Sequence, residues 1–420
     1  MSFQQGLSGL NASSKNLEVI GNNVANANTF GAKASRAEFA DMYANAIGAG
    51  GASDIGIGVT LGAVAQQFTQ GNITATENPL DLAINGAGFF QVTDGSNAPQ
   101  YTRNGQFKVD RTGYIVNNQR QRLMGYPADA AGAIQAGQAK ALQMPTAGIT
   151  PAPSTAIKME LNLDARAPMT APTAGVPIDF TDPKTYNNAT SVTVYDAKGQ
   201  DVALTYYFQK AATDTWNVFV TANGTPISTT SGNPAASTTF TFPANGGKPT
   251  APVGTVNLDI PAVTNSVGAL TVAIPGVQLN VSGATQYGSQ FGVTDLSQDG
   301  YAAGQLIGVQ FEDNGIITAR YSNGQSKPAG QLEIANFRNP QGLQSRGGNA
   351  WSATYASGDP IVGVPGAGNL GALKAGALEE SNVDLTAELV NMITAQRVYQ
   401  ANAQTIKTQD QLLQTIVNLR

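Results

Sequence analysis

Hydrophobic residues recur with helical spacing at both ends of this 420-residue chain, while most of the sequence between them alternates as strands do. Near the start, successive apolar positions are four, three, seven and seven residues apart, and the far end repeats this heptad spacing over a longer stretch. Such spacing is typical of helices that pack along one seam. The N-terminal seam consists of Phe3, Leu7, Leu10, Leu17 and Val24, and the C-terminal seam of Leu385, Leu389, Met392, Tyr399, Ala403, Ile406, Leu413 and Val417. The pattern predicts terminal helices within residues 1–30 and 380–420.

The start of the second helix carries signals of its own. Ser381 followed by Asp384 resembles a capping box, in which two side chains bond the free backbone N–H groups of a first turn. Acidic residues lie at the beginning of this helix and Arg420 at its far end, as the helix dipole favours. The acidic residues are Glu379, Glu380, Asp384 and Glu388. We therefore expect one helix from about residue 382 to residue 420.

The faces away from the two seams hold few charges. Lys15 and Glu18 are the only charged residues before Lys33, and the remainder is mostly Asn, Ser, Gln, Gly and Ala. A lone surface helix normally carries many charges on its wet side, and short amphipathic helices are only marginally stable alone. The scarcity of charge favours helices packed by neighbours on several sides, so both seams are predicted to drive assembly between copies. A helical hairpin within one chain is the alternative.

Short apolar runs separated by turn signals fill the middle of the chain. The first turn signals are Asn85-Gly86, Asp94-Gly95 and Asn104-Gly105. Asn-Gly between two such runs is the strongest local signal for a β-hairpin. The region up to Tyr126 is therefore predicted to be a β-meander.

A change of composition marks a second β-rich module. Seven prolines lie between Pro145 and Pro183, which indicates a linker and the edge of a new domain. Strand-like runs follow to about residue 282, and then the earlier hairpin pattern returns, with Asn-Gly pairs at 314 and 323. One domain split by another explains this return. We predict a mainly β fold with terminal α-helices that form a coiled-coil-like domain (1–30 and 380–420), extended connecting segments (31–70 and 371–379), a split β-domain (71–145 and 285–370) and an inserted outer β-domain (146–284).

Composition excludes many kinds of active site. The chain has no Cys and no His, so Ser-His-Asp and Cys-His nucleophiles, Cys or His zinc sites, iron–sulfur clusters and haem ligation are ruled out. The net charge of −5 argues against a nucleic-acid partner. No run of about 18 apolar residues is present, so no membrane insertion is expected. The first residues also lack the basic and apolar regions of a secretory signal peptide.

Three local patterns imitate known sites without their context. Gly366, Gly368 and Gly371 spell G-x-G-x-x-G, but no βαβ unit surrounds them, so a loop is expected. Residues 295–299 imitate the start of a calcium loop, but Leu306 stands at its twelfth position, so a turn is expected. Neighbouring acids could serve glycoside hydrolysis, but no aromatic cluster accompanies them. We assign no catalytic, metal or cofactor-binding residue and expect no enzyme activity.

The two ends together resemble the signatures of bacterial flagellar axial proteins, the family of rod and hook subunits. The matching N-terminal residues are Asn22, Asn23, Ala25, Asn26, Asn28, Thr29, Gly31 and Lys33. The matching C-terminal residues are Ser381, Asn382, Val383, Asp384, Gln396, Arg397, Tyr399, Ala401, Asn402 and Asp410. Residues 80–92, 101–116 and 335–343 are similar to the domain that rod and hook subunits share. One departure is Ala32, where the family commonly has Phe, and Phe30 is expected to supply that packing.

The resemblance implies a structural subunit. Distal rod proteins are similar at both ends but lack a large insertion, so the inserted module favours the hook members, which polymerise into a curved helical tube that acts as a flexible joint between rod and filament. The implied partners are further copies, the rod, hook-cap and hook-filament junction proteins, and the flagellar type III export apparatus. The implied location is the hook, outside the cell, without a cleaved signal peptide. A distal rod or junction component, and a carbohydrate-binding or glycosidase-like surface protein, are the alternatives.

Overall fold

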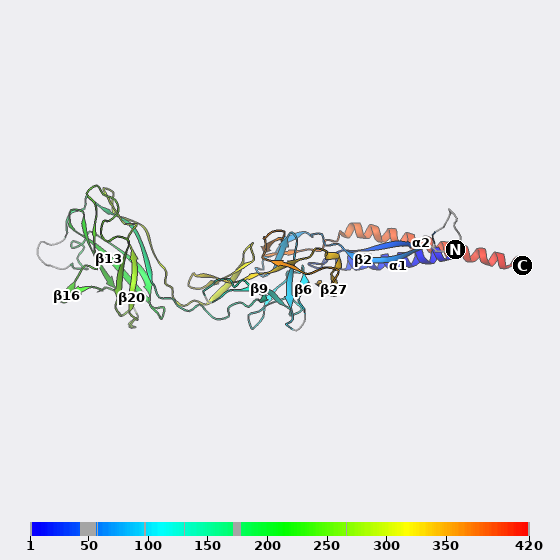
Figure 1. Cartoon of the computed structure of the whole chain (residues 1–420), viewed down its shortest axis with the longest axis horizontal. Coiled ribbons are helices and arrows are strands. Elements are labelled where there is room, and N and C mark those ends of the chain that lie inside the picture. The colour runs from blue at the N-terminus through cyan, green and yellow to red at the C-terminus, as the bar shows by residue number, and fades with distance from the viewer. Residues whose placement is uncertain are drawn as a thin grey trace. The chain divides into compact units, whose positions relative to one another are not determined.

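The chain divides into two compact units. The computed structural model describes residues 2–42, 56, 58–95, 98–129, 131–170, 178–265 and 267–418. Unit 1 comprises Met1–Thr146, Gly308–Arg320 and Ser326–Arg420, and unit 2 comprises Ala147–Ile307 and Tyr321–Gln325. Strands dominate both units, and the two long helices are the first and last elements of the chain (Figure 1). The predicted fold class, mainly β with terminal helices, is confirmed.

The terminal helices run side by side in opposite directions (Figure 1). Their bounds are Ser2–Ala25 for α1 and Leu385–Asn418 for α2. The predicted capping box at the start of α2 is wrong, because Asp384 is itself the N-cap: its Oδ1 accepts hydrogen bonds from the backbone N–H groups of Thr386 at 2.9 Å and Ala387 at 3.1 Å. Ser381 Oγ accepts a backbone N–H two residues on, outside the helix. A carboxylate at the N-cap suits the positive end of the helix dipole.

A two-stranded ribbon follows α1, and two short strand pairs join the start of unit 1 to its end. The ribbon pairs β1, Ser35–Met42, antiparallel with β2, Gly58–Gln66, and it packs along α1. The short pairs are β3, Ile73–Ala75, with β31, Ala377–Glu379, and β4, Leu82–Asn85, with β30, Ala372–Ala375. The segments predicted as extended connectors therefore contain paired strands, and the last of these strands leads directly to α2.

The remaining strands of unit 1 form one antiparallel β-domain. Its sheet runs in the order β23-β24-β25-β9-β5-β6-β28-β27, with shorter strands attached to this path. The bounds are Phe89–Thr93 (β5), Gln100–Thr102 (β6), Lys108–Val109 (β7), Ile115–Val116 (β8), Arg122–Pro127 (β9), Lys140–Ala141 (β10), Leu306–Phe311 (β23), Ile316–Tyr321 (β24), Ser326–Leu332 (β25), Ile334–Asn336 (β26), Pro340–Gly342 (η1), Gln344–Gly347 (β27), Ala350–Ser352 (β28) and Ile361–Gly363 (β29). Leu82, Phe90, Phe107 and Leu332 are buried in its main core. A second, aromatic cluster surrounds Trp351.

Unit 2 consists mainly of two sheets whose inner side chains share one core. One sheet has the order β19-β20-β11-β21 with β22 also on β11, and the other β12-β13-β14-β15 with β18 also on β14. The bounds are Ala156–Asp164 (β11), Asn188–Tyr195 (β12), Asp201–Ala212 (β13), Thr215–Ala222 (β14), Thr225–Pro226 (β15), Thr229–Thr230 (β16), Asn233–Pro234 (β17), Thr238–Thr241 (β18), Thr255–Ile260 (β19), Ile274–Asn280 (β20), Thr285–Tyr287 (β21) and Gly292–Gln298 (β22). Trp216, Tyr206 and Phe208 are fully buried between them.

The inserted module continues further along the chain than residue 284. Strand β22 pairs antiparallel with β11, and unit 2 extends to Ile307. Residues 285–305, which the sequence pattern gave to the split domain, therefore lie in unit 2. The turn expected at 295–299 is a strand up to residue 298, and Asp295 forms an ion pair with Lys158 of β11 at 3.1 Å. Pairing with a strand more than a hundred residues earlier is what a local pattern does not reveal.

Candidate assembly surface and motif junction

The two terminal helices contact each other through small residues. Gly6 lies against Ile406, and a Cβ atom placed on Gly9 would lie only 2.9 Å from the side-chain amide of Asn402. Ser13 and Ile20, at heptad spacing from Gly6, are also buried. The helices therefore approach closely along a face that carries glycine and serine as well as isoleucine.

The predicted N-terminal seam lies beside this contact face. Leu7 is 44% exposed, and Leu10, Leu17 and Val24 are half-buried. Because the contact with α2 uses the neighbouring face of α1, the seam retains apolar surface that the chain itself does not cover.

The C-terminal seam is more exposed still. Met392, Ala403 and Ile406 are half-buried, whereas the other described seam residues are exposed: Leu385 and Leu389 at 44%, Tyr399 at 37% and Leu413 at 56%. Val417 lies in α2 but outside the residues whose side chains are described. Further apolar residues of α2 are exposed, namely Val390, Ile393, Val398 and Leu412. The intrachain helix pair predicted as the alternative does form, yet it leaves most of this seam uncovered.

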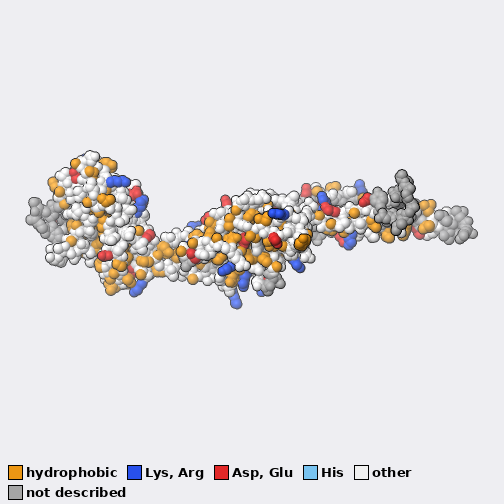
Figure 2. Space-filling view, viewed as in Figure 1, with side chains coloured by type: hydrophobic (Ala, Val, Ile, Leu, Met, Phe, Trp, Pro, Cys, Tyr) orange, Lys and Arg blue, Asp and Glu red, His pale blue; other side chains and the backbone are white. Residues whose placement is uncertain are grey.

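A groove remains between the helix pair and the strand ribbon. It has a volume of about 530 Å³ and is lined by both helices and by β1. Ile20, Ala395 and Val398 give it apolar walls, and Asn16 and Asn391 add amides. Charged side chains are scattered over the visible face of both units (Figure 2), in keeping with a sequence that is only 12% charged.

The N-terminal motif residues form the turn that carries the chain from α1 into β1. Asn23 is buried at the end of α1, where its Oδ1 accepts the N–H of Ser35 and its Nδ2 donates to the C=O of Ser35, both at 2.8 Å. Its Nδ2 also donates to Glu388 of α2 at 3.1 Å. Gly31 has a φ of +70° and packs against the backbone of Asn104. A residue with a side chain would disfavour this φ, and its Cβ would clash with that backbone. These motif residues therefore fix the end of α1 against β1 and α2.

Other N-terminal motif residues are nearer the surface. Asn26 Nδ2 donates to the C=O of Asn22 at 2.9 Å, and Thr29 Oγ1 donates to Asn26 Oδ1 at 3.4 Å. Asn28 is exposed and borders a cavity with Phe30. Ala32 is buried, and Phe30 is half-buried at the rim of that cavity rather than inside the aromatic cluster around Trp351.

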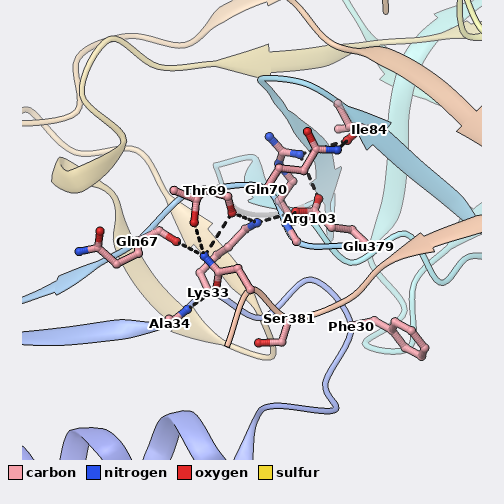
Figure 3. A network of polar contacts seen from close by, with 12 residues as sticks. Phe30, Lys33, Ala34, Gln67, Thr69, Gln70, Ile84, Arg103, Glu379 and Ser381 are labelled. Carbon is pink, nitrogen blue, oxygen red and sulfur yellow. Dashed lines mark hydrogen bonds and ion pairs between the residues drawn. The ribbon is translucent and has the colours of Figure 1, made fainter. Parts of the chain in front are cut away.

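A buried cluster of three charges lies where both chain ends meet the β-domain. Lys33 Nζ donates to Glu379 Oε1 at 2.5 Å, and Arg103 Nη1 donates to Glu379 Oε2 at 3.0 Å (Figure 3). The side chains of Lys33 and Glu379 are fully buried and that of Arg103 is 5% exposed. We call Lys33, Arg103 and Glu379 the junction cluster.

Further hydrogen bonds satisfy most of the junction cluster. Lys33 Nζ also donates to the C=O of Thr69 at 2.8 Å, and the N–H of Gly71 donates to Glu379 Oε1 at 2.9 Å. Arg103 Nη2 donates to a backbone C=O at 2.7 Å. Burial lowers the pKa of Lys33 and of Arg103, and the carboxylate of Glu379 opposes this lowering in both. One carboxylate thus holds two cations in a site closed to water.

The C-terminal motif begins beside the junction cluster. Asn382 Oδ1 accepts the N–H of Ala34 at 2.7 Å, and its Nδ2 donates to the C=O groups of Gln67 at 2.7 Å and Thr69 at 3.2 Å. Val383 borders a small cavity together with Asn23 and Lys33. The two motifs, more than 340 residues apart in sequence, are thereby joined directly.

The motif residues within α2 divide between two environments. Asn402 faces Gly9 of α1, while Gln396, Arg397 and Tyr399 are exposed. The sequence pattern gave Lys33 to the N-terminal motif, gave Glu379 to the start of the second helix and gave Arg103 no role. The helix begins only at Leu385, and Glu379 instead bonds Lys33 and Arg103. The one sequence feature that pointed to the cluster was Lys33, an isolated charge in a segment with few charges. Its partners could not be found from the local pattern because they lie in distant parts of the chain.

Nothing in the described residues points to catalysis. They hold no group of three or more acidic side chains placed to share a metal ion. Gly366 and Gly368 have positive φ angles in a turn between β29 and β30, as expected for a loop. Trp216 and Trp351 are buried at 0% and 2% exposure and offer no stacking platform for a sugar. Among the described residues, neither α1 nor α2 is both long enough and apolar enough to span a membrane.

Family models match most of the chain. They are the flagella basal body rod protein (residues 3–33), the flagellar hook protein FlgE/F/G D1 domain (83–166), the flagellar basal body protein FlaE D2 domain (162–301) and the flagellar basal body rod FlgEFG protein C-terminal region (374–419). The match at 162–301 lies within unit 2, the matches at 3–33 and 374–419 lie within unit 1, and the match at 83–166 runs from unit 1 into the start of unit 2.

Curated relatives match over the full length. The flagellar hook protein FlgE of Salmonella typhimurium is 42% identical and that of Escherichia coli K12 is 40% identical, in each case over 100% of both chains. FlgE of Borreliella burgdorferi is 32% identical over 100% of this chain and 99% of that protein. The crystal structure of Helicobacter pylori flagellar hook protein FlgE2 has a TM-score of 0.53 at 15% identity, covers 73% of this chain and 100% of that one, and shows a shared fold.

The family models at both ends and the full-length relatives identify a flagellar axial protein, with paired terminal helices, a split β-domain and an inserted pair of sheets. The chain belongs to the flagellar hook protein FlgE family. It is a structural protein and not an enzyme. The distal rod alternative is set aside by relatives that are hook proteins over their whole length, and the glycosidase-like alternative by the same finding.

Proposed function

We propose that the uncovered seams of α1 and α2 are the surfaces through which copies of this chain polymerise into the hook. The chain is a structural subunit of the flagellar hook, and its family self-polymerises within the rod and hook structure. The observation that carries the proposal is the exposure of Leu385, Leu389 and Leu413 on a helix whose contact with α1 takes up only part of the seam, at Ile406.

The physical argument rests on apolar area. Burying a leucine side chain contributes about 1.5–3 kcal/mol, and α2 holds several that its own chain leaves open. When identical subunits join by a contact between two different surfaces, the result is an open helix rather than a closed ring. Helices at the inner surface of such a tube, with the β-rich units outside, agree with the low charge of α1 and α2. Curvature and bending of the tube would then arise from the β-rich units.

The finer partners follow from this role. A hook subunit meets the rod at one end of its tube, and a cap and the hook-filament junction proteins at the other. We place the protein in the hook outside the cell, exported by the flagellar type III apparatus without cleavage of its N-terminal residues. Further copies of this chain are its principal partner.

The seam is tested by placing a charge in it. Leu389→Asp should leave the β-domains folded and abolish tube formation, because a carboxylate buried without a partner costs at least as much as the leucine contributes. Thr408→Asp, at an exposed position of α2 off the seam, is the matched control and should assemble normally. Sedimentation and electron microscopy of polymerisation reactions measure the outcome. Tubes of Leu389→Asp at the wild-type critical concentration would show that the seam is not an assembly surface.

A further inference from the structure

Half of the described hydrogen bonds of the N-terminal segment 31–34 join it to the C-terminal segment 379–382. The N–H of Gly31 donates to the C=O of Glu379 at 2.8 Å, Lys33 donates to the carboxylate of the same residue, and the N–H of Ala34 donates to Asn382 Oδ1 at 2.7 Å. The bond from Lys33 to Thr69 adds a contact with the segment after β2. The N–H of Gln67 also donates to the C=O of Ala34 at 2.7 Å. Segment 31–34 therefore rests on segments 67–69 and 379–382, and only the second provides the countercharge for Lys33 and the acceptors for the N–H groups of Gly31 and Ala34.

Segment 379–382 has its own attachment to the β-domain. Strand β31 pairs with β3, and the N–H of Glu380 donates to the C=O of Asn72 at 2.8 Å. Arg103 and the N–H of Gly71 bond the carboxylate of Glu379. None of these contacts involves residues 31–34.

The three charges of the junction cluster (Figure 3) make the two terminal segments depend on each other to different degrees. If Lys33 is absent, Arg103 and Glu379 remain as a one-to-one ion pair, and the N–H of Gly71 still bonds the carboxylate. If the carboxylate of Glu379 is absent, two cations face each other in a buried site with no countercharge. Burial of an unpaired charge is strongly unfavourable, and like charges add repulsion. The N-terminal segment thus needs Glu379, whereas the C-terminal segment does not need Lys33.

We propose that the two terminal segments dock in a fixed order. Segment 379–382 docks on the β-domain by itself, and segment 31–34 docks only on the surface that Glu379 and Asn382 then provide. Since segment 31–34 leads from α1, the position of α1 depends on the C-terminal segment, whereas the reverse dependence is weak. If the seams assemble as proposed above, this order ensures that α1 is positioned for assembly only after the segment that leads into α2 has docked.

Hydrogen exchange of the full-length monomer, read by mass spectrometry, tests the order. Glu379→Gln should raise exchange in peptides covering 26–36 by at least tenfold. Lys33→Met should raise exchange in the same peptides but leave peptides covering 373–380 within about twofold of wild type. Glu380→Gln, one residue along and half-buried beside Asn72, is the matched control and should change neither region. Peptides of unit 2 should be unaffected in every variant, which shows that the fold is intact.

A second variant avoids any change of buried charge. Asn382→Ala removes the acceptor for the N–H of Ala34 and should speed exchange in 31–36 without affecting 373–380, so it keeps the test decisive if Glu379→Gln fails to fold. The proposal is overturned if Lys33→Met loosens 373–380 as much as 26–36, or if Asn382→Ala leaves 31–36 protected. Because the readout is made on monomers, its failure leaves the assembly result for Leu389→Asp unaffected.

Discussion

Two buried glutamates of unit 1 lie in opposite environments. Glu379 has two cations and a backbone N–H around its carboxylate. Glu333, between β25 and β26, is 3% exposed and has only the hydroxyl of Tyr126 at 3.4 Å as a side-chain partner, while its Oε2 has none. Burial raises the pKa of Glu333, and the phenol of Tyr101 is the other titratable group that senses its charge. The first carboxylate organises the junction, and the second opposes folding when it ionises.

Removing the second carboxylate should stabilise unit 1 in a pH-dependent way. A raised pKa in the folded state means that the native protein holds the proton more tightly than the unfolded chain, so stability falls as pH rises above the unfolded value of about 4.3 and levels off above the folded one. At pH 7, Glu333→Gln should therefore have a higher urea midpoint than wild type. Its free energy of unfolding should be greater by about 1–3 kcal/mol, as expected when an unsatisfied buried group is removed. The difference in unfolding free energy between Glu333→Gln and wild type should disappear towards pH 4.

The two tryptophans allow unit 1 to be followed alone. Trp351 is buried in unit 1 and Trp216 in unit 2, so a Trp216→Phe background leaves a single fluorescence reporter in unit 1. Glu77→Gln, at an exposed acid of the same unit, should show no pH-dependent gap. An equal gap at pH 4 and pH 7 for Glu333→Gln would mean that a change of packing, and not ionisation, is responsible.

At the scale of elements, the glycines of α1 have different tasks. Gly9 lies against Asn402 with no space for a Cβ, whereas nothing lies within 4 Å of a Cβ on Gly21. Alanine is favoured over glycine inside a helix by about 1 kcal/mol. Gly21→Ala should therefore slow hydrogen exchange along α1 about fivefold, while Gly9→Ala should gain less or reverse sign because it pushes α2 away. Equal protection in both variants would contradict the close helix contact.

The terminal helices illustrate how much of the structure a sequence pattern predicts. Heptad spacing located α1 and α2 to within a few residues, because apolar periodicity is a local property. The face that joins them was not predicted, since Gly6, Gly9 and Ser13 add nothing to a hydrophobic pattern. The junction cluster was missed for a related reason: the partners of Lys33 are 70 and 346 residues away in sequence, and ion pairs of this kind depend on the fold. The end of the inserted module was misplaced because β22 belongs to it through pairing with β11, more than a hundred residues earlier in the sequence.

At the scale of the whole molecule, the two units have separate cores. The buried cluster around Trp216 draws only on unit 2, and the clusters around Phe90 and Trp351 draw only on unit 1. The chain enters and leaves unit 2 on neighbouring segments, because Ile149 and Gly304 form an isolated antiparallel bridge with hydrogen bonds of 2.8 and 3.2 Å. A domain with its own core and adjacent entry and exit points is one that a fold tolerates losing.

Deleting residues 150–303 and closing the gap between Ile149 and Gly304 with Asn-Gly should therefore leave unit 1 folded. A two-residue Asn-Gly turn matches the twist of an antiparallel pair, so the closure needs no rearrangement of the strands that lead to it. The expected result is a urea transition of Trp351 within about 1 kcal/mol of that of the Trp216→Phe full-length chain, since neither unit contributes to the core of the other. The same variant should still polymerise, because α1, α2 and the junction cluster are untouched, and electron microscopy should show thinner tubes with altered curvature. Loss of the Trp351 transition would show that unit 1 requires the inserted module to fold. A folded variant that forms no tubes would show that unit 2 supplies part of the assembly surface.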